Sequence, residues 1–153
     1  MTDKILDVGC GKRKYPNSIG IDINPSSHAD FFEDARDMSF ANNIFDMVYS
    51  AYVIQHIPED EKVVKEIHRV LKANGLFIFK TIAFFHISKR HFPIPTVVLR
   101  KLHLGKLLYP YLRFYSKQDI RKLLKGFKIK EMHYSFENYG SITCVAEKIP
   151  KGR

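Results

Sequence analysis

Acidic residues and glycines recur at the ends of the apolar segments near the start of the chain. Asp7, Gly9 and Gly11 close the first segment, Asp22 ends the second, and Asp34 follows the third. Glycines at the end of a strand let the backbone approach a ligand closely and adopt positive φ. An acidic side chain after the second strand can accept hydrogen bonds from both ribose hydroxyls, and a later carboxylate can accept from an adenine amino group. This set therefore predicts an adenosine site.

The elements that must hold these side chains can be predicted from apolar runs and helical spacing. Strands are expected over residues 4–8, 18–23, 30–33, 45–50, 76–82, 127–135 and 141–147, and helices over 59–72 and 117–125. Strands alternating with helices predict an α/β fold, with a mostly parallel sheet covered on both faces. Because the carboxyl ends of parallel strands meet at one edge, the three carboxylates can face one ligand.

The order and spacing of these segments resemble those of class I S-adenosylmethionine-dependent methyltransferases. The similar segments are 5–11 (ILDVGCG), 20–23 (GIDI), 33–36 (EDAR), 45–57 (FDMVYSAYVIQHI), 66–79 (EIHRVLKANGLFIF) and 114–129 (FYSKQDIRKLLKGFKI). They match, in order, the glycine motif, the second-strand acid, the adenine-side motif, the fourth strand, the next helix and strand, and the late helix and sixth strand. The resemblance covers most of the chain and leaves out residues 83–113.

The resemblance implies a Rossmann-like three-layer sandwich, with a mostly parallel seven-stranded sheet and an antiparallel last strand. It implies S-adenosylmethionine as cofactor and methyl transfer by in-line displacement to an unidentified small-molecule or lipid-like acceptor. The sulfonium is an activated leaving group, so the protein has to align the reactants and exclude water rather than supply a triad. The implied cofactor-binding residues are Asp7, Gly9, Cys10, Gly11, Asp22, Ile23, Asp34, Ala35 and Ser50.

Two side chains after the fourth strand are candidates for the chemistry. Tyr52 and His56 lie where acceptor and methyl donor meet in this family, and His56 could orient a nucleophile or take its proton. The structural alternative is a histidine satisfied at the turn before Pro58. Asp7 likewise has a structural alternative as a buried carboxylate that accepts from loop amides.

The connection after Gly11 is shorter than the family pattern. Residues 12–18 include Pro16 and cannot form the usual helix, so we expect the helix N-terminus beside the methionine carboxylate to be missing. Lys12, Arg13 or loop amides are the hypothesised replacement. The missing helix leaves one sheet face thinly covered, which favours a homodimer.

A nicotinamide-binding Rossmann unit is the nearest alternative for the fold. That unit requires G-x-G-x-x-G and an acid about 20 residues further on. Here Lys14 occupies the third glycine position, and Asp22 follows too soon. The glycine pattern therefore favours the methyltransferase interpretation.

Charge is divided unevenly along the chain. Residues 1–79 hold nine Lys/Arg and twelve Asp/Glu, a net charge of −3, whereas residues 80–153 hold sixteen and four, a net charge of +12. We expect one methyltransferase domain over 1–153, in which 83–115 is a basic aromatic insertion that acts as a substrate lid or partner surface. The basic surface at 80–130 is typical either of a protein with an anionic partner, RNA or a membrane surface, or of an ordinary solvated lysine-rich surface.

Two other functions remain open from the sequence. The chain could be an RNA methyltransferase that uses its basic 83–130 surface, or a degenerate protein of the same fold that binds without catalysis. The chain shows no transmembrane segment and no signal-peptide pattern, and Cys10 and Cys144 have no metal-ligand spacing. A cytoplasmic location without a metal site is therefore expected.

Overall fold

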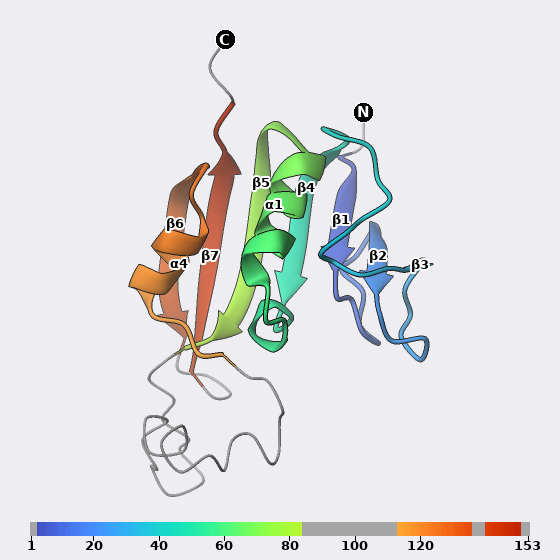
Figure 1. Cartoon of the computed structure of the whole chain (residues 1–153), viewed down its shortest axis with the longest axis horizontal. Helices are drawn as coiled ribbons and strands as arrows, with labels where there is room; N and C mark the ends of the chain where they lie inside the picture. Colours follow the sequence, from blue (N-terminus) through green and yellow to red (C-terminus); the bar gives the residue numbers. More distant parts are fainter. Residues whose placement is uncertain (1–2, 84–112, 136–139, 151–153) are drawn as a thin grey trace, which may run out of the picture.

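A single seven-stranded sheet organises the protein, as the computed structural model shows for residues 3–83, 113–135 and 140–150 (Figure 1). The strands are β1 (Ile5–Val8), β2 (Ser18–Asp22), β3 (Phe31–Phe32), β4 (Phe45–Ala51), β5 (Leu71–Ile82), β6 (Phe127–Ser135) and β7 (Ser141–Lys148). Their order across the sheet is β3-β2-β1-β4-β5-β7-β6. Strands β1 to β5 pair in parallel, and β7 lies antiparallel between β5 and β6. The predicted Rossmann-like fold with an antiparallel last strand is confirmed.

Two helices, α1 (Asp60–Val70) and α4 (Lys117–Leu123), lie side by side on one face of the sheet (Figure 1). The apolar positions Val63, Ile67 and Val70 of α1 are fully buried against the strands. A capping box between Ser116 and Asp119 begins α4, since each side chain bonds the other residue's backbone amide. Within the described ranges no helix lies on the opposite face.

The boundary between α1 and β5 differs from the prediction. The helix was expected to reach Lys72, but it ends at Val70, and β5 begins directly at Leu71. Leu71 adopts an extended conformation and pairs with Phe45 of β4, so tertiary pairing ends the helix earlier than its periodicity indicates. Asn74, where φ is positive, lies within the β5 span.

The first and last residues of the basic aromatic segment, Ala83 and Tyr115, lie side by side. Ala83 and Tyr115 form a parallel bridge next to the carboxyl end of β5. The predicted lid or partner surface at 83–115 lies mostly outside the described residues, which leave out 84–112. In the part of the chain that the structure describes, no helix is long and apolar enough to cross a membrane.

Candidate functional site

Asp7 lies within β1 and joins that strand to the connection that follows it. The residue is 2% exposed, and its Oδ2 accepts a 2.7 Å hydrogen bond from the Tyr15 amide. Burial raises the pKa of Asp7, and the negative charge of Asp22 adds to the rise, while the Tyr15 amide and Lys14 oppose it. Asp7 thus has the structural contact expected of a buried carboxylate that accepts from a loop amide.

The two glycines of the turn after β1 play different parts. Gly9 and Gly11 both have positive φ, 72° and 53°. A Cβ atom on Gly9 would lie 2.2 Å from Val53 Cγ2, so the absence of a side chain lets Val53 pack against the turn. A Cβ atom on Gly11 would meet no atom within 4 Å. The turn is therefore closed at Gly9 and open at Gly11, where a ligand can approach the backbone.

Asp22 ends β2 and faces this open side of the turn. Its Oδ2 accepts a hydrogen bond from the Gly11 amide at 2.9 Å, and its Oδ1 accepts from the Asn24 amide at 2.8 Å. Each carboxylate oxygen has two acceptor sites, so both oxygens keep one for a further donor. Asp22 is half-buried, which leaves its carboxylate accessible to ligand hydroxyls.

The connection between β1 and β2 consists of turns, as its length predicts. The Gly9 and Cys10 amides both donate to the Ile21 carbonyl, at 2.8 and 3.1 Å. These amides are therefore not available to an anion as those of a helix N-terminus would be. Lys12 and Arg13 are exposed beside the turn.

Two side-chain contacts fix this connection where the family has a helix. Lys14 Nζ lies 2.7 Å from Asp30 Oδ2, and the same carboxylate accepts from the Gly20 amide at 2.7 Å. The Gly20 amide and then the Lys14 ammonium hold the pKa of Asp30 below its usual range. The Tyr15 ring packs against the Tyr49 ring of β4, with centroids 4.6 Å apart. The turn is thus anchored to both neighbouring strands.

Three further predicted cofactor residues lie around the turn with different exposures. Cys10 is buried, and burial raises the pKa of its thiol to about 11. The Ser50 hydroxyl is also buried and donates to the Val8 carbonyl at 3.0 Å, which joins β4 to β1. Ile23, beside Asp22, is 72% exposed. Of these three, Ile23 is the side chain that a bound ligand could cover.

Asp34 is engaged by Arg36, two residues further along the chain. The Arg36 guanidinium donates to both Asp34 oxygens, and the Arg36 amide donates to Oδ1 at 2.8 Å. Hydrogen bonding to the Arg36 side chain lowers the pKa of Asp34. Arg36 also donates to Glu59 at 2.8 Å, and Ala35 packs on the core. An adenine amino group at Asp34 would therefore share the carboxylate with Arg36.

Tyr52 and His56 lie after the carboxyl end of β4, around the 3₁₀ helix η1 (Ile54–His56). Tyr52 has φ of 60°, a conformation that is a genuine outlier for a bulky residue and that clusters at functional sites. Its amide donates to the Lys80 carbonyl at 2.8 Å, and Lys80 Nζ lies 5.5 Å from its ring centroid. Both candidate side chains are exposed, at the edge where β4 and β5 end.

A buried polar cluster beside this edge was not predicted as functional. Asp60 is 4% exposed and accepts a 2.7 Å hydrogen bond from the Tyr115 hydroxyl and a charged bond from Arg113. Gln55 is also buried, and its Oε1 accepts from the Thr81 hydroxyl at 2.9 Å. In the sequence, Asp60 lies near the start of the helix expected over 59–72. Its partners lie more than fifty residues away, and no local pattern indicates them.

Parts of this sequence are similar to known proteins. Residues 6–79 match the profile of the methyltransferase domain family. The chain is 29% identical over 129 residues to a ubiquinone/menaquinone biosynthesis C-methyltransferase of Rickettsia typhi, an alignment of 74% of this chain and 51% of that protein. It is 40% identical over 63 residues to a sterol 4-C-methyltransferase of Caenorhabditis elegans, across 39% of this chain and 19% of that protein.

A solved structure shares the fold over almost the whole chain. An S-adenosylmethionine-dependent methyltransferase of Methanosarcina mazei superposes with a TM-score of 0.75 at 18% identity, covering 97% of this chain and 93% of that one. The chain belongs to the class I S-adenosylmethionine-dependent methyltransferase family. It spans from about a fifth to about half of the length of the curated methyltransferases it matches.

S-adenosylmethionine, the methyl donor of this methyltransferase family, fits the residues around the turn. The space beyond Gly11 is open, and a carboxylate with spare acceptor sites stands beside it at Asp22. Exposed Ile23 adds an apolar surface next to that carboxylate. These are the features that an adenosine needs for its ribose hydroxyls and its ring.

Proposed function

We propose that this chain transfers a methyl group from S-adenosylmethionine to a small, lipid-like acceptor. The observation that carries the proposal is the placement of Asp22 beside the open side of the glycine turn at Gly11. Asp22 would accept the ribose hydroxyls, and Ile23 would lie against the adenine. When bound, the cofactor supplies a sulfonium-activated methyl group, so the chain has to hold the acceptor in line and keep water out.

The lipid-like acceptor is supported by the names of the relatives. They are methyltransferases of ubiquinone and menaquinone biosynthesis and of sterols, and the first kind aligns with about three quarters of this chain. The acceptor would lie at the carboxyl ends of β4 and β5, near Tyr52 and Lys80. His56 is the proposed base, because imidazole takes a proton near neutral pH and its side chain is exposed at this edge.

Calorimetry and a transfer assay test the proposal in sequence. In calorimetry, the chain is expected to bind either S-adenosylmethionine or S-adenosylhomocysteine at a single site. In the transfer assay, it is expected to pass a radiolabelled methyl group from S-adenosylmethionine into the solvent-extractable fraction of a lipid extract. His56→Gln should leave cofactor affinity unchanged and lower the transfer rate by about 10²-fold, a typical contribution of one general base. Absence of cofactor binding would refute the whole proposal, and label in the aqueous fraction alone would refute the lipid-like acceptor.

A further inference from the structure

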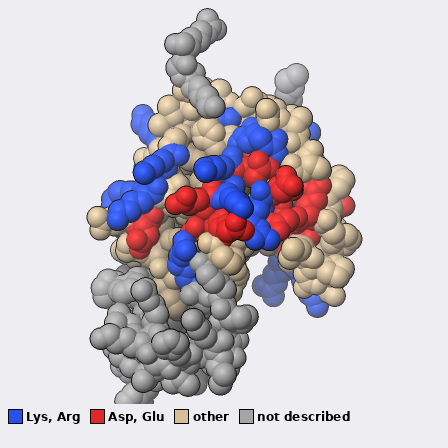
Figure 2. Space-filling view, in the orientation of Figure 1, with Lys and Arg blue, Asp and Glu red and all other residues tan. Residues whose placement is uncertain are grey.

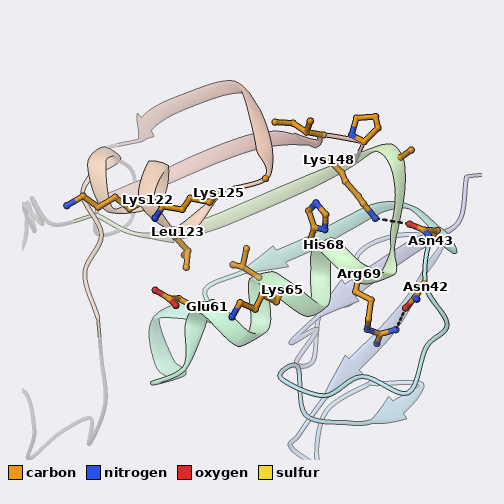
Figure 3. Close-up of a pocket in the computed structure, with 15 residues that line it drawn as sticks. Asn42, Asn43, Glu61, Lys65, His68, Arg69, Lys122, Leu123, Lys125 and Lys148 are labelled. Atoms are coloured by element: carbon orange, nitrogen blue, oxygen red, sulfur yellow. Dashed lines mark hydrogen bonds between the residues drawn. The ribbon is translucent and has the colours of Figure 1, made fainter. Parts of the chain in front are cut away.

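A hollow of about 920 Å³ lies on the helical face of the sheet, between α1 and the segment formed by α4 and the turn after it (Figure 3). We call this hollow the helical groove. None of the glycine-turn residues lines it, so it is separate from the proposed cofactor site. The basic residues that line it are Lys65, His68, Arg69, Lys122, Lys125 and Lys148.

Three of these side chains have charge to offer to a ligand. Lys65, Lys122 and Lys125 are exposed and take part in none of the ion pairs formed among residues 3–83, 113–135 and 140–150. Glu61 is the one acidic residue among the described residues of the lining. Lys and Arg side chains gather over the α4 side of this face, whereas acidic side chains gather nearer its centre (Figure 2). The positive potential is therefore concentrated along the α4 side.

Apolar side chains are recessed in the lining, among polar ones. Val64 is 4% exposed, and Leu123 packs partly buried against the same core. The Lys148 ammonium is fixed in the wall by bonds to the Asn43 side-chain oxygen at 2.8 Å and the Leu71 carbonyl at 2.6 Å. The groove thus has a cationic rim on the α4 side and a single exposed lysine, Lys65, on the α1 side, with recessed apolar side chains in its lining that can contact a planar base.

We propose that the helical groove binds a short segment of single-stranded RNA. Lys65 from one side, and Lys122 and Lys125 from the other, would contact backbone phosphates as point charges. The His68 imidazole, whose ring meets Phe127 edge-on at 5.2 Å between centroids, lies in the lining as a surface on which a base can stack. Since lysines read no sequence, binding is expected to depend on charge rather than on base identity.

The shape of the groove favours a strand over a membrane surface. Lipid headgroups lie in a plane and are reached by a flat or protruding face, often with apolar side chains that insert between lipids. Here the apolar side chains Val64 and Leu123 lie back in the hollow and cannot insert. A flexible polyanion can enter the groove and contact lysines on both rims at once.

Fluorescence anisotropy with a labelled twelve-nucleotide oligouridylate tests this proposal on the full chain without S-adenosylmethionine. A dissociation constant between about 1 and 100 μM is expected near physiological salt, the range of non-specific binding. The triple variant Lys65→Gln, Lys122→Gln, Lys125→Gln should bind at least about tenfold more weakly. Its slope of log affinity against log salt should be shallower by about 2, since each phosphate contact to a single strand contributes about 0.7.

A matched control removes the same charge elsewhere. Lys4, Lys128 and Lys130 do not line the groove, and their triple Gln variant should bind RNA within about threefold of the unsubstituted protein. Thermal unfolding confirms that both variants fold. The proposal is overturned if the unsubstituted protein does not bind RNA, if both triple variants weaken equally, or if the groove variant loses binding to phosphatidylserine vesicles and not to RNA. Because the measurement omits the cofactor, its failure is distinguishable from failure of the proposed methyl transfer.

Discussion

At the scale of single residues, one carboxylate connects the glycine turn to the ligand side of the sheet. Asp22 accepts from the Gly11 and Asn24 amides and still has acceptor capacity for a ribose. The same side chain therefore shapes the turn and would bind the cofactor. The Gly9 and Cys10 amides of the turn are not free for the cofactor in this way, because both donate to the Ile21 carbonyl of β2.

Asp22→Asn should weaken S-adenosylmethionine binding by about 10- to 100-fold, the range for losing a charged hydrogen bond. Both Asp22 oxygens accept from backbone amides, so the side-chain NH₂ of asparagine would bring a second donor against one of these amides. Isothermal titration calorimetry gives the dissociation constants. Asp37→Asn serves as control, because Asp37 is exposed and should leave the constant unchanged. Equal constants for the Asp22 variant and the unsubstituted protein would disprove the ribose contact.

Arg13 and Lys12 are the exposed cations nearest in sequence to the turn, where the family has a helix N-terminus. If Arg13 binds the methionine carboxylate, Arg13→Ala should raise the dissociation constant of S-adenosylmethionine about tenfold, as expected for one charge-assisted pair. Binding of 5′-methylthioadenosine, which lacks that carboxylate, should change less than about twofold. Competition titrations compare the two ligands. Parallel losses for both, or a loss for neither, would show that Arg13 is not the carboxylate partner, and Lys12→Ala is then the next variant.

At the scale of elements, the loop after β4 is held against the loop after β1. Val53 fills the space that a side chain on Gly9 would need, and Tyr52 immediately before it has positive φ. The proposed acceptor edge and the proposed cofactor turn are therefore in direct contact. A change in one of these loops should be transmitted to the other.

Gly9→Ala should destabilise the fold more than Gly11→Ala, although both glycines have positive φ. A left-handed alanine costs about 1–2 kcal/mol. At Gly9 the new methyl also overlaps Val53, which should bring the loss of unfolding free energy to about 2–4 kcal/mol. Urea denaturation gives both values. Adding Val53→Ala to Gly9→Ala should recover part of the extra loss, and strictly additive effects would contradict direct contact.

The bond between Tyr115 and Asp60 should make stability depend on alkaline pH. Burial, then hydrogen bonding to Asp60 and its charge, raise the pKa of the Tyr115 hydroxyl well above its usual range. In the unfolded chain the phenol ionises near pH 10, so the folded state retains a proton that the unfolded state has released. The bond therefore contributes fully below about pH 10, and its contribution falls by up to about 1.4 kcal/mol per pH unit above that.

Tyr115→Phe should lower the unfolding free energy by about 1–3 kcal/mol at neutral pH, because Asp60 loses a buried donor. The difference from the unsubstituted protein should shrink between pH 10 and 12, as urea denaturation at several pH values would show. Burial also raises the pKa of the Cys10 and Cys144 thiols to about 11. Both cysteines are present in the variant and in the unsubstituted protein, so their effects on the difference cancel. A constant difference across this range would mean that the hydroxyl is not held as described.

These element-scale contacts explain what the sequence could and could not predict. The acids and glycines at the ends of β1 and β2 were found because their spacing is local and each lies at a strand end. The Tyr115–Asp60 bond joins residues 55 positions apart, and the packing of Val53 on Gly9 depends on how two loops meet. The start of β5 was missed because pairing with β4 overrides helical periodicity. The bond between Arg36 and Asp34 could not be predicted either, since it depends on side-chain orientation.

At the scale of the whole molecule, charge separates the two proposed sites. Residues 1–79, with a net charge of −3, contain all the proposed cofactor residues, whereas residues 80–153 carry +12 and supply the α4 side of the helical groove. A cationic cofactor and an anionic strand would therefore each be drawn to the part of opposite charge. Both attractions act over distances that salt screens.

The acidity around the turn should distinguish the methyl donor from its product. S-adenosylmethionine carries the sulfonium charge that S-adenosylhomocysteine lacks. Asp7 and Asp22 are the acids at the ends of the strands that flank the turn, and the negative charge of Asp22 contributes to raising the pKa of Asp7. Raising salt from 50 to 500 mM should weaken the binding of S-adenosylmethionine by about two- to fivefold, because the Debye length contracts from roughly 14 to 4 Å. S-adenosylhomocysteine should change by less than about 1.5-fold over the same range. Calorimetric titrations of both ligands at three salt concentrations make the comparison. If both constants respond alike, the acids around the turn act only through hydrogen bonds, and the preference for a charged donor has to arise at the sulfur itself.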